Sequence, residues 1–146
     1  MMTAVRTILL AEDNVNDIEL TLAALRSNSV VNEVVVVRDG VAALDYLYLR
    51  GGFASRSPEH PGLILLDLKM PKVDGLEVLQ EIKSDGVLKT IPIVVLTSSR
   101  EESDLVRTYA LGVNAYVVKP VVFHEFMEAV KVLGQFWAVV NEPPPL

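Results

Sequence analysis

The stretch LILLD at residues 63–67 is a continuous apolar run that ends in a carboxylate. Unbroken runs of Leu, Ile and Val are typical of strands buried on both faces, as in a parallel sheet covered by helices. Four more short apolar runs share this character, and they lie at Thr7–Ala11, Val34–Val37, Ile93–Leu96 and Tyr116–Val118. We therefore predict a parallel sheet of five short strands.

Helical signals fill the segments between these runs. Asn14 with Asp17, and Ser99 with Glu102, form N-capping patterns, and Gly112 ends the fourth segment. Apolar residues recur at helical spacing at Ile18, Leu22 and Leu25; at Val41, Leu44, Leu47 and Tyr48; at Leu76, Leu79 and Ile82; at Leu105, Val106, Tyr109 and Ala110; and at Phe123, Phe126, Val130 and Leu133. Alternating strands and helices predict an α/β fold, a three-layer doubly wound (βα)5 sandwich of the flavodoxin-like type.

Sheets of this type with parallel strand order 2-1-3-4-5 bind ligands beyond the carboxyl ends of the strands, where the order reverses between strands one and three. We take this order from the fold class, since the sequence does not derive it. It brings the ends of the first and third apolar runs side by side. Residues that follow those two runs are therefore expected to face one crevice.

Length and composition exclude several classes of protein. The 146 residues suit one compact domain, and 51% of them are hydrophobic. The absence of cysteine excludes disulfides and thiol nucleophiles. A net charge of −6 without a Lys/Arg stripe argues against direct nucleic-acid binding. The N-terminal apolar run is too short for a signal peptide or membrane span, so we expect a cytoplasmic protein with no membrane partner.

Two segments are expected to lie outside the regular elements. Residues 50–62 (RGGFASRSPEHPG) have the composition of a loop, and one longer than the usual helix–strand connection. Residues 142–146 contain three prolines and are expected to form a flexible tail. The domain is accordingly expected to span residues 1–141.

A polar residue follows each of the five apolar runs, and four of the runs supply residues that can converge on one site. Glu12 and Asp13 follow the first, Asp67 the third, Thr97 the fourth and Lys119 the fifth. Taken singly, each carboxylate is more often a surface acid, Thr97 a strand-end cap and Lys119 a solvated lysine. Together they indicate one site, because clustered like charges are unfavourable unless a cation offsets them.

Carboxylate oxygens are the hard ligands that Mg²⁺ prefers. We expect Asp13 and Asp67 to be direct ligands, the backbone carbonyl of Lys69 to be a third, and Glu12 to act directly or through water. Asp67 would then be the nucleophile that attacks phosphorus and becomes an aspartyl-phosphate. Lys119 would pair with one phosphate oxygen, and the hydroxyl of Thr97 would donate to another.

Four motifs extend this pattern over nearly the whole chain: AEDNVND at 11–17, LLDLKMPKVDG at 65–75, VVLTSS at 94–99 and NAYVVKP at 114–120. This ordered set resembles the CheY-like receiver domain of two-component response regulators. The resemblance implies that a histidine kinase donates the phosphoryl group. It also implies the role of each residue: Asp67 is the acceptor, Glu12 and Asp13 are the acidic pair, Thr97 is the switch hydroxyl, Tyr116 is the switch aromatic, and Lys119 is the lysine joined to Pro120 by a cis peptide bond.

The same resemblance implies a switch. Thr97 would swing toward the phosphoryl group, and Tyr116 would fill the space that it leaves, which would change the surface of the fourth helix, fifth strand and fifth helix. Such a domain is not a conventional enzyme, although it catalyses its own aspartyl phosphorylation and dephosphorylation. The long segment at 50–62 and the EDNxxD opening resemble single-domain regulators that partner phytochrome-type kinases.

Other functions stay open at this point. The chain could be a phosphorelay intermediate or phosphate sink, or an interaction module that is not phosphorylated. A haloacid-dehalogenase-type phosphatase also uses an Asp nucleophile and Mg²⁺. Such enzymes need a second Asp two residues later as general acid, and this chain has Lys69 there.

The C-terminal helical segment carries more apolar residues than one inward face can hold, at Phe136, Trp137, Val139 and Val140. Exposed apolar patches of this kind usually mark an interface. We therefore expect a two-fold homodimer that involves the last helix. Extra packing within one chain is the alternative.

Overall fold

A computed structural model describes residues 7–26, 32–98 and 115–132 of the chain, with side chains up to residue 129. Its five-stranded parallel sheet has the order β2-β1-β3-β4-β5, as predicted. The strands are β1 (Ile8–Ala11), β2 (Val34–Val37), β3 (Leu63–Asp67), β4 (Ile93–Thr97) and β5 (Tyr116–Val118). Asp67 and Thr97 are the last residues of their strands rather than the first residues of loops. Their positions are therefore fixed by sheet pairing.

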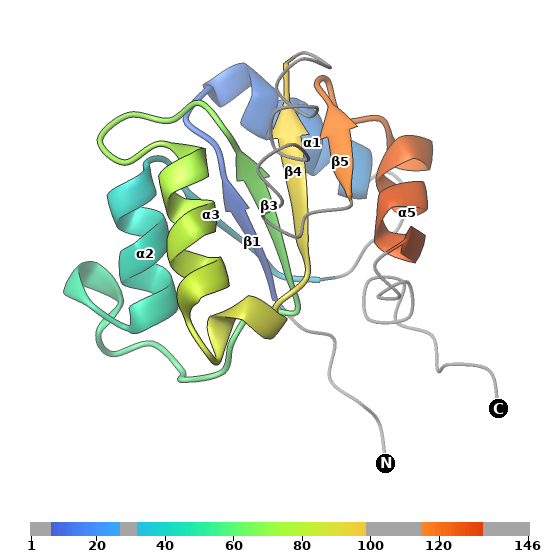
Figure 1. Cartoon of the computed structure of the whole chain (residues 1–146). Coiled ribbons are helices and arrows are strands. Elements are labelled where there is room, and N and C mark those ends of the chain that lie inside the picture. Colours follow the sequence, from blue (N-terminus) through green and yellow to red (C-terminus); the bar gives the residue numbers. More distant parts are fainter. Residues whose placement is uncertain (1–6, 27–31, 99–114, 133–146) are drawn as a thin grey trace, which may run out of the picture.

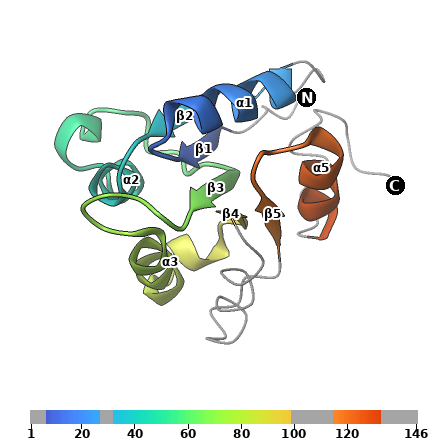
Figure 2. The same cartoon turned by 90° about the horizontal axis from the view of Figure 1, so that it is seen from above.

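Helices cover both faces of this sheet, so the three-layer prediction is confirmed (Figure 1). The elements are α1 (Val15–Arg26), α2 (Gly40–Tyr48), α3 (Gly75–Ser84) and α5 (Phe123–Val132), with short 3-10 helices η1 (Gly51–Phe53) and η2 (Leu88–Thr90). Viewed from above, α2 and α3 lie on one side of the sheet, and α1 and α5 lie on the other (Figure 2). The helix predicted from Ser99 to Gly112 lies outside the described residues.

Two apolar cores, one on each face of the sheet, explain why the strand sequences are unbroken apolar runs. Leu9, Ile64 and Val95 pack on the side of α2 and α3. Their neighbours Leu10 and Leu65 pack on the opposite side, with Phe126 of α5. Each fully buried Leu or Ile side chain contributes about 1.5–3 kcal/mol relative to exposure. Side chains on both faces of β1, β3 and β4 are thus buried, as the sequence pattern predicted. The edge strands β2 and β5 depart from the prediction, because most of their side chains are only half-buried.

The apolar face predicted for α2 was partly wrong. Val41 was assigned to the buried face, but it is 40% exposed, whereas Ala43 and Tyr46 are buried. The start of the helix accounts for this. Asp39 is the N-cap and accepts a hydrogen bond from the backbone N–H of Ala42 at 2.7 Å. Gly40, the first helical residue, is buried, so the face that includes Ala43 and Tyr46 turns toward the sheet.

The segment at 50–62 is more ordered than its composition indicated. It contains η1, and the Arg56 guanidinium lies 4.0 Å from the centre of the Tyr46 ring. Arg56 Nε donates to the Tyr46 carbonyl at 2.8 Å, and Nη1 donates to the Glu59 carbonyl at 2.9 Å. The ring of Phe53 meets Tyr46 edge-on at 5.2 Å. One arginine therefore ties this segment to the C-terminal end of α2.

No helix in the described ranges 7–26, 32–98 and 115–132 is long and apolar enough to cross a lipid bilayer.

Candidate metal centre

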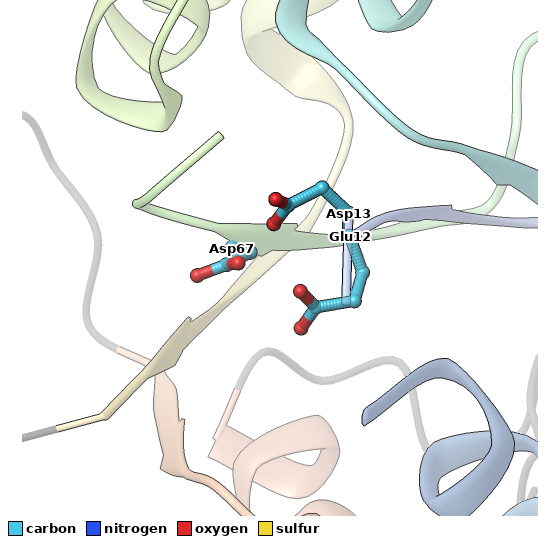
Figure 3. Close-up of side chains that lie close together, drawn as sticks. All are labelled: Glu12, Asp13 and Asp67. Carbon is cyan, nitrogen blue, oxygen red and sulfur yellow. The ribbon is translucent and has the colours of Figure 1, made fainter. Parts of the chain in front are cut away.

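Three carboxylates meet at the carboxyl edge of the sheet. Glu12 and Asp13 directly follow β1, and Asp67 ends β3. These strands pair in parallel, with Ala11 opposite Leu66, so their ends lie side by side. One carboxylate oxygen from each of the three residues lies within 4.8 Å of the other two (Figure 3). The structure therefore brings together the three acidic residues that the sequence grouped.

This donor set fits a hard divalent cation such as Mg²⁺. Glu12 is 0% exposed and Asp67 is 3% exposed, whereas Asp13 is half-buried. The backbone N–H of Lys69 donates to Asp67 Oδ1 at 3.2 Å, which orients that carboxylate and places Lys69 beside the cluster. The side chain of Lys69 is itself exposed. A cation here would offset the repulsion between buried carboxylates.

Lys119 is the cationic centre of the cluster. Its Nζ lies 3.1 Å from Glu12 Oε1, 3.1 Å from Asp17 Oδ2 and 3.3 Å from Asp67 Oδ2, and 14% of its side chain is exposed. The peptide bond between Lys119 and Pro120 is cis, as the resemblance implied. The ammonium predicted to meet a phosphate oxygen is thus already held between three carboxylates.

Asp17 is the residue that sequence reasoning missed as part of the site. It was interpreted only as a partner in the N-cap of α1, and its backbone N–H does donate to Asn14 Oδ1 at 3.0 Å. Its carboxylate nevertheless contacts Lys119. One signal was available: side chains in the first turn of a helix point back toward its N-terminus. Since α1 begins just after Glu12 and Asp13, an acid in this turn points at the site.

The pKa values follow from burial and charge. Burial first, and then the hydrogen bond and negative charge of Asp67, raise the pKa of Glu12 to about 7, although the Asn14 N–H and Lys119 act in the opposite direction. For Lys119, burial lowers the pKa, but Asp17, Asp67 and Glu12 together raise it above its usual range. Lys119 is therefore charged at neutral pH, and one ammonium faces several acids. A bound metal cation would offset this excess of negative charge.

The two residues assigned to the switch lie on neighbouring strands. Thr97 ends β4 and is 0% exposed, and its carbonyl accepts a hydrogen bond from the Lys119 N–H at 2.8 Å. Tyr116 begins β5 opposite Val95, and it is half-buried against the core on the α2 and α3 side. The dimer candidates Phe136, Trp137, Val139 and Val140 lie outside the described residues.

Comparison with known proteins identifies the family. The family model for the response regulator receiver domain matches residues 8–131, which is most of the chain. The chain belongs to this family. It is thus a receiver of two-component signalling, as the four motifs indicated.

Its relatives include phytochrome response regulators. The receiver is 58% identical to the bacteriophytochrome response regulator AtBRR, covering 96% of this chain and 100% of that chain, with a TM-score of 0.91. It is 46% identical to RcpA, a cyanobacterial phytochrome response regulator solved in its phosphorylated form, with coverage of 97% and 100% and a TM-score of 0.74.

A third relative is response regulator Rcp1 of Synechocystis sp. (strain ATCC 27184 / PCC 6803 / Kazusa). The sequences are 42% identical over 132 residues, covering 90% of this chain and 88% of Rcp1. A solved structure of Rcp1 holds Mn²⁺; it is 38% identical, covers 97% of this chain and 99% of that chain, and has a TM-score of 0.73. These likenesses extend over almost the full length of each protein.

Proposed function

We propose that this receiver accepts a phosphoryl group from a histidine kinase onto Asp67 in a Mg²⁺-dependent reaction. The observation that supports this is the convergence of Glu12, Asp13 and Asp67 within 4.8 Å at the sheet edge. A carboxylate oxygen of Asp67 attacks the phosphorus of a phosphohistidine, an O–P bond forms, and the P–N bond breaks. The electron pair of the broken P–N bond stays on the imidazole nitrogen of the kinase histidine.

Asp13, Asp67, Glu12 and the carbonyl of Lys69 would hold the cation. Mg²⁺ supplies charge neutralisation for the incoming phosphoryl oxygens. RcpA is a phosphorylated relative and Rcp1 has been solved with Mn²⁺, which supports both parts of the proposal.

Lys119 and Thr97 would respond to the new phosphoryl group. Lys119 Nζ lies 3.3 Å from Asp67 Oδ2, so it can pair with a phosphoryl oxygen after a small movement. The hydroxyl of Thr97, at the end of the neighbouring strand, would donate to another oxygen. Tyr116 would then take up the space that Thr97 leaves. This rearrangement would switch the surface around β5 and α5 between two packed states.

The donor that we propose is a cytoplasmic histidine kinase of the phytochrome type. AtBRR and RcpA are named as phytochrome response regulators, and this chain shares 58% and 46% identity with them. Phosphotransfer profiling, in which the chain is mixed with each autophosphorylated kinase of its source organism, identifies the cognate donor as the one that transfers fastest. Preference for a kinase without a phytochrome-type sensor would contradict this assignment.

Metal removal is the direct test of the mechanism. With EDTA present, we expect transfer from a phosphorylated kinase to slow by about 10³-fold, because the cation provides several kcal/mol of charge stabilisation. Phosphorylated and free protein can be separated on a phosphate-affinity gel. Adding back excess Mg²⁺ or Mn²⁺ should restore the rate. Unchanged transfer in EDTA would contradict the metal-dependent mechanism.

We further propose that the receiver spans residues 1–141 with a flexible tail at 142–146, and that it forms a homodimer through Phe136, Trp137, Val139 and Val140. The support is the number of apolar residues on one helical segment. Deleting residues 135–146 is expected to convert a dimer to a monomer, measured as mass by light scattering. A truncated chain that dimerises as well as the full chain would rule out this interface.

A further inference from the structure

Residues 37–40, which are the connection between β2 and α2 with the last strand residue and the first helix residue, contact both loops that carry the proposed metal ligands. They contribute no ligand themselves. On the β1 side, the carbonyl of Val37 accepts a hydrogen bond from the Glu12 N–H at 3.0 Å. Arg38 Nη2 donates to the carbonyl of Asp13 at 3.0 Å. This connection, which we name the β2–α2 brace, therefore holds the backbone of both acidic residues that follow β1.

On its other side the brace contacts the β3–α3 loop, residues 68–74. The N–H of Gly40 points to the Pro71 carbonyl at 3.5 Å, and Asp39 Oδ2 lies 3.4 Å from Lys72 Nζ. A side chain at Gly40 would overlap the backbone carbonyl of Val73, so only glycine allows this approach. Lys72 has a φ of 68°, a conformation uncommon for a residue with a side chain. The loop is thus fitted closely against the start of α2.

The ends of this loop are fixed independently. Gly75 N–H donates to the Leu68 carbonyl at 2.9 Å, and a side chain at Gly75 would overlap the carbonyl oxygen of Asp67. Met70 is 8% exposed and packs in the core on the α2 and α3 side. The ends of the loop and Met70 are thus held by β3, α3 and the core, whereas Gly40 and the Asp39–Lys72 ion pair join the loop to the start of α2. Lys69, the expected carbonyl ligand, lies in this loop.

We propose that the β2–α2 brace sets the spacing between the two ligand-bearing loops, and that Arg38 and Gly40 are positioning residues for the divalent cation. This inference rests on the proposed function, because it concerns the same metal site. The brace acts on backbone geometry. Arg38 holds the backbone carbonyl of Asp13, whose side chain is an expected ligand, and Gly40 lets the β3–α3 loop lie close to the start of α2. Residues that orient ligands in this way commonly change metal affinity by about 10–100-fold when they are replaced.

A purely electrostatic role and a positioning role for Arg38 predict opposite changes in Mg²⁺ affinity when this residue is replaced. If Arg38 acted only through its positive charge, removing it would favour a cation beside Asp13 and tighten Mg²⁺ binding. If it positions the loop, removing it weakens binding. We expect Arg38→Gln to weaken Mg²⁺ affinity by about threefold, the effect of one lost hydrogen bond. Unchanged or tighter binding would overturn the role of Arg38.

Gly40→Ala changes no charge and tests the second contact. We expect Mg²⁺ affinity to fall by about tenfold, measured by isothermal titration calorimetry on the unphosphorylated full chain. Two controls accompany it. Gly86→Ala makes the same change where an added side chain meets nothing within 4 Å. Leu88→Ala removes a core side chain that is 2% exposed and lowers stability at the amino ends of the strands, the edge of the sheet opposite both loops. Equal affinity in Gly40→Ala and Leu88→Ala would contradict a positioning role.

A measurement on the unmodified chain decides the question if Gly40→Ala fails to fold. Because the brace joins both loops, Mg²⁺ should shift the backbone amide resonance of Gly40 together with those of Asp13 and Lys69. A shift at Asp13 and Lys69 with none at Gly40 would overturn the inference and leave the metal site intact. Absence of any Mg²⁺-dependent shift at all would instead contradict the proposed function.

Discussion

Replacing Asp67 by Asn is expected to reduce phosphorylation of this receiver to background. The amide lacks the anionic oxygen that attacks phosphorus, and it is a weaker ligand for a hard cation. The measurement is incubation with acetyl phosphate or a phosphorylated kinase, followed by intact-protein mass spectrometry. Asp74→Asn is a matched control: Asp74 caps α3 by accepting from the Glu77 N–H at 2.9 Å, and Asn caps a helix equally well. This control should be labelled normally.

Asp67→Asn is expected to keep its fold, so that loss of labelling reports the missing nucleophile and not unfolding. The Asn carbonyl can still accept the Lys69 N–H that now reaches Asp67 Oδ1. Lys119 keeps Glu12 and Asp17 as partners at 3.1 Å. The substitution also relieves repulsion between Asp67 and the buried Glu12. Thermal unfolding followed by circular dichroism should therefore show no loss of stability. Continued labelling of the variant at another residue would refute the assignment of Asp67.

The acidic cluster could be predicted from sequence because two regularities act together. Parallel strands end at the same edge of a sheet, and residues that follow buried runs are fixed in position by those runs. Asp13 and Asp67 lie at the ends of adjacent strands, so the pattern of runs and carboxylates predicted the cluster once the strand order was known. The strand order itself came from the fold class. The same reasoning located Lys119 and Thr97 at the correct edge.

The features that sequence did not predict depend on the relative placement of distant segments. The contact of Asp17 with Lys119 joins residues 102 positions apart and depends on where the first turn of α1 lies relative to the residue that follows β5. The exposed position of Val41 depends on how α2 is rotated against the β3–α3 loop. Arg56 looked like an ordinary loop residue, and only the fold shows its stacking on Tyr46. Apart from the first-turn position of Asp17 in α1, none of these features has a periodicity or local motif that would indicate it.

Replacing Lys119 by Met should destabilise the metal-free protein and make it unusually sensitive to Mg²⁺. The change keeps an unbranched side chain but leaves Glu12, which is 0% exposed, and Asp67, which is 3% exposed, without their cation. Removing one member of a fully buried ion pair costs about 3–5 kcal/mol. Because 14% of the Lys119 side chain is exposed and Asp17 is also partly open to solvent, we expect a smaller loss of about 2 kcal/mol in the free energy of unfolding.

Urea unfolding in EDTA measures the loss of stability without metal, and urea unfolding in excess Mg²⁺ measures how much the cation restores. A bound cation would replace part of the missing charge, so Mg²⁺ should raise the stability of Lys119→Met by more than it raises that of the unmodified chain. Lys89→Met is the control, since Lys89 is exposed in η2 and remote from the cluster. Phosphorylated Lys119→Met should also lack the amide shifts in β5 and α5 that report the switch. Equal stability of the two lysine variants in EDTA would show that Lys119 does not hold the carboxylates together.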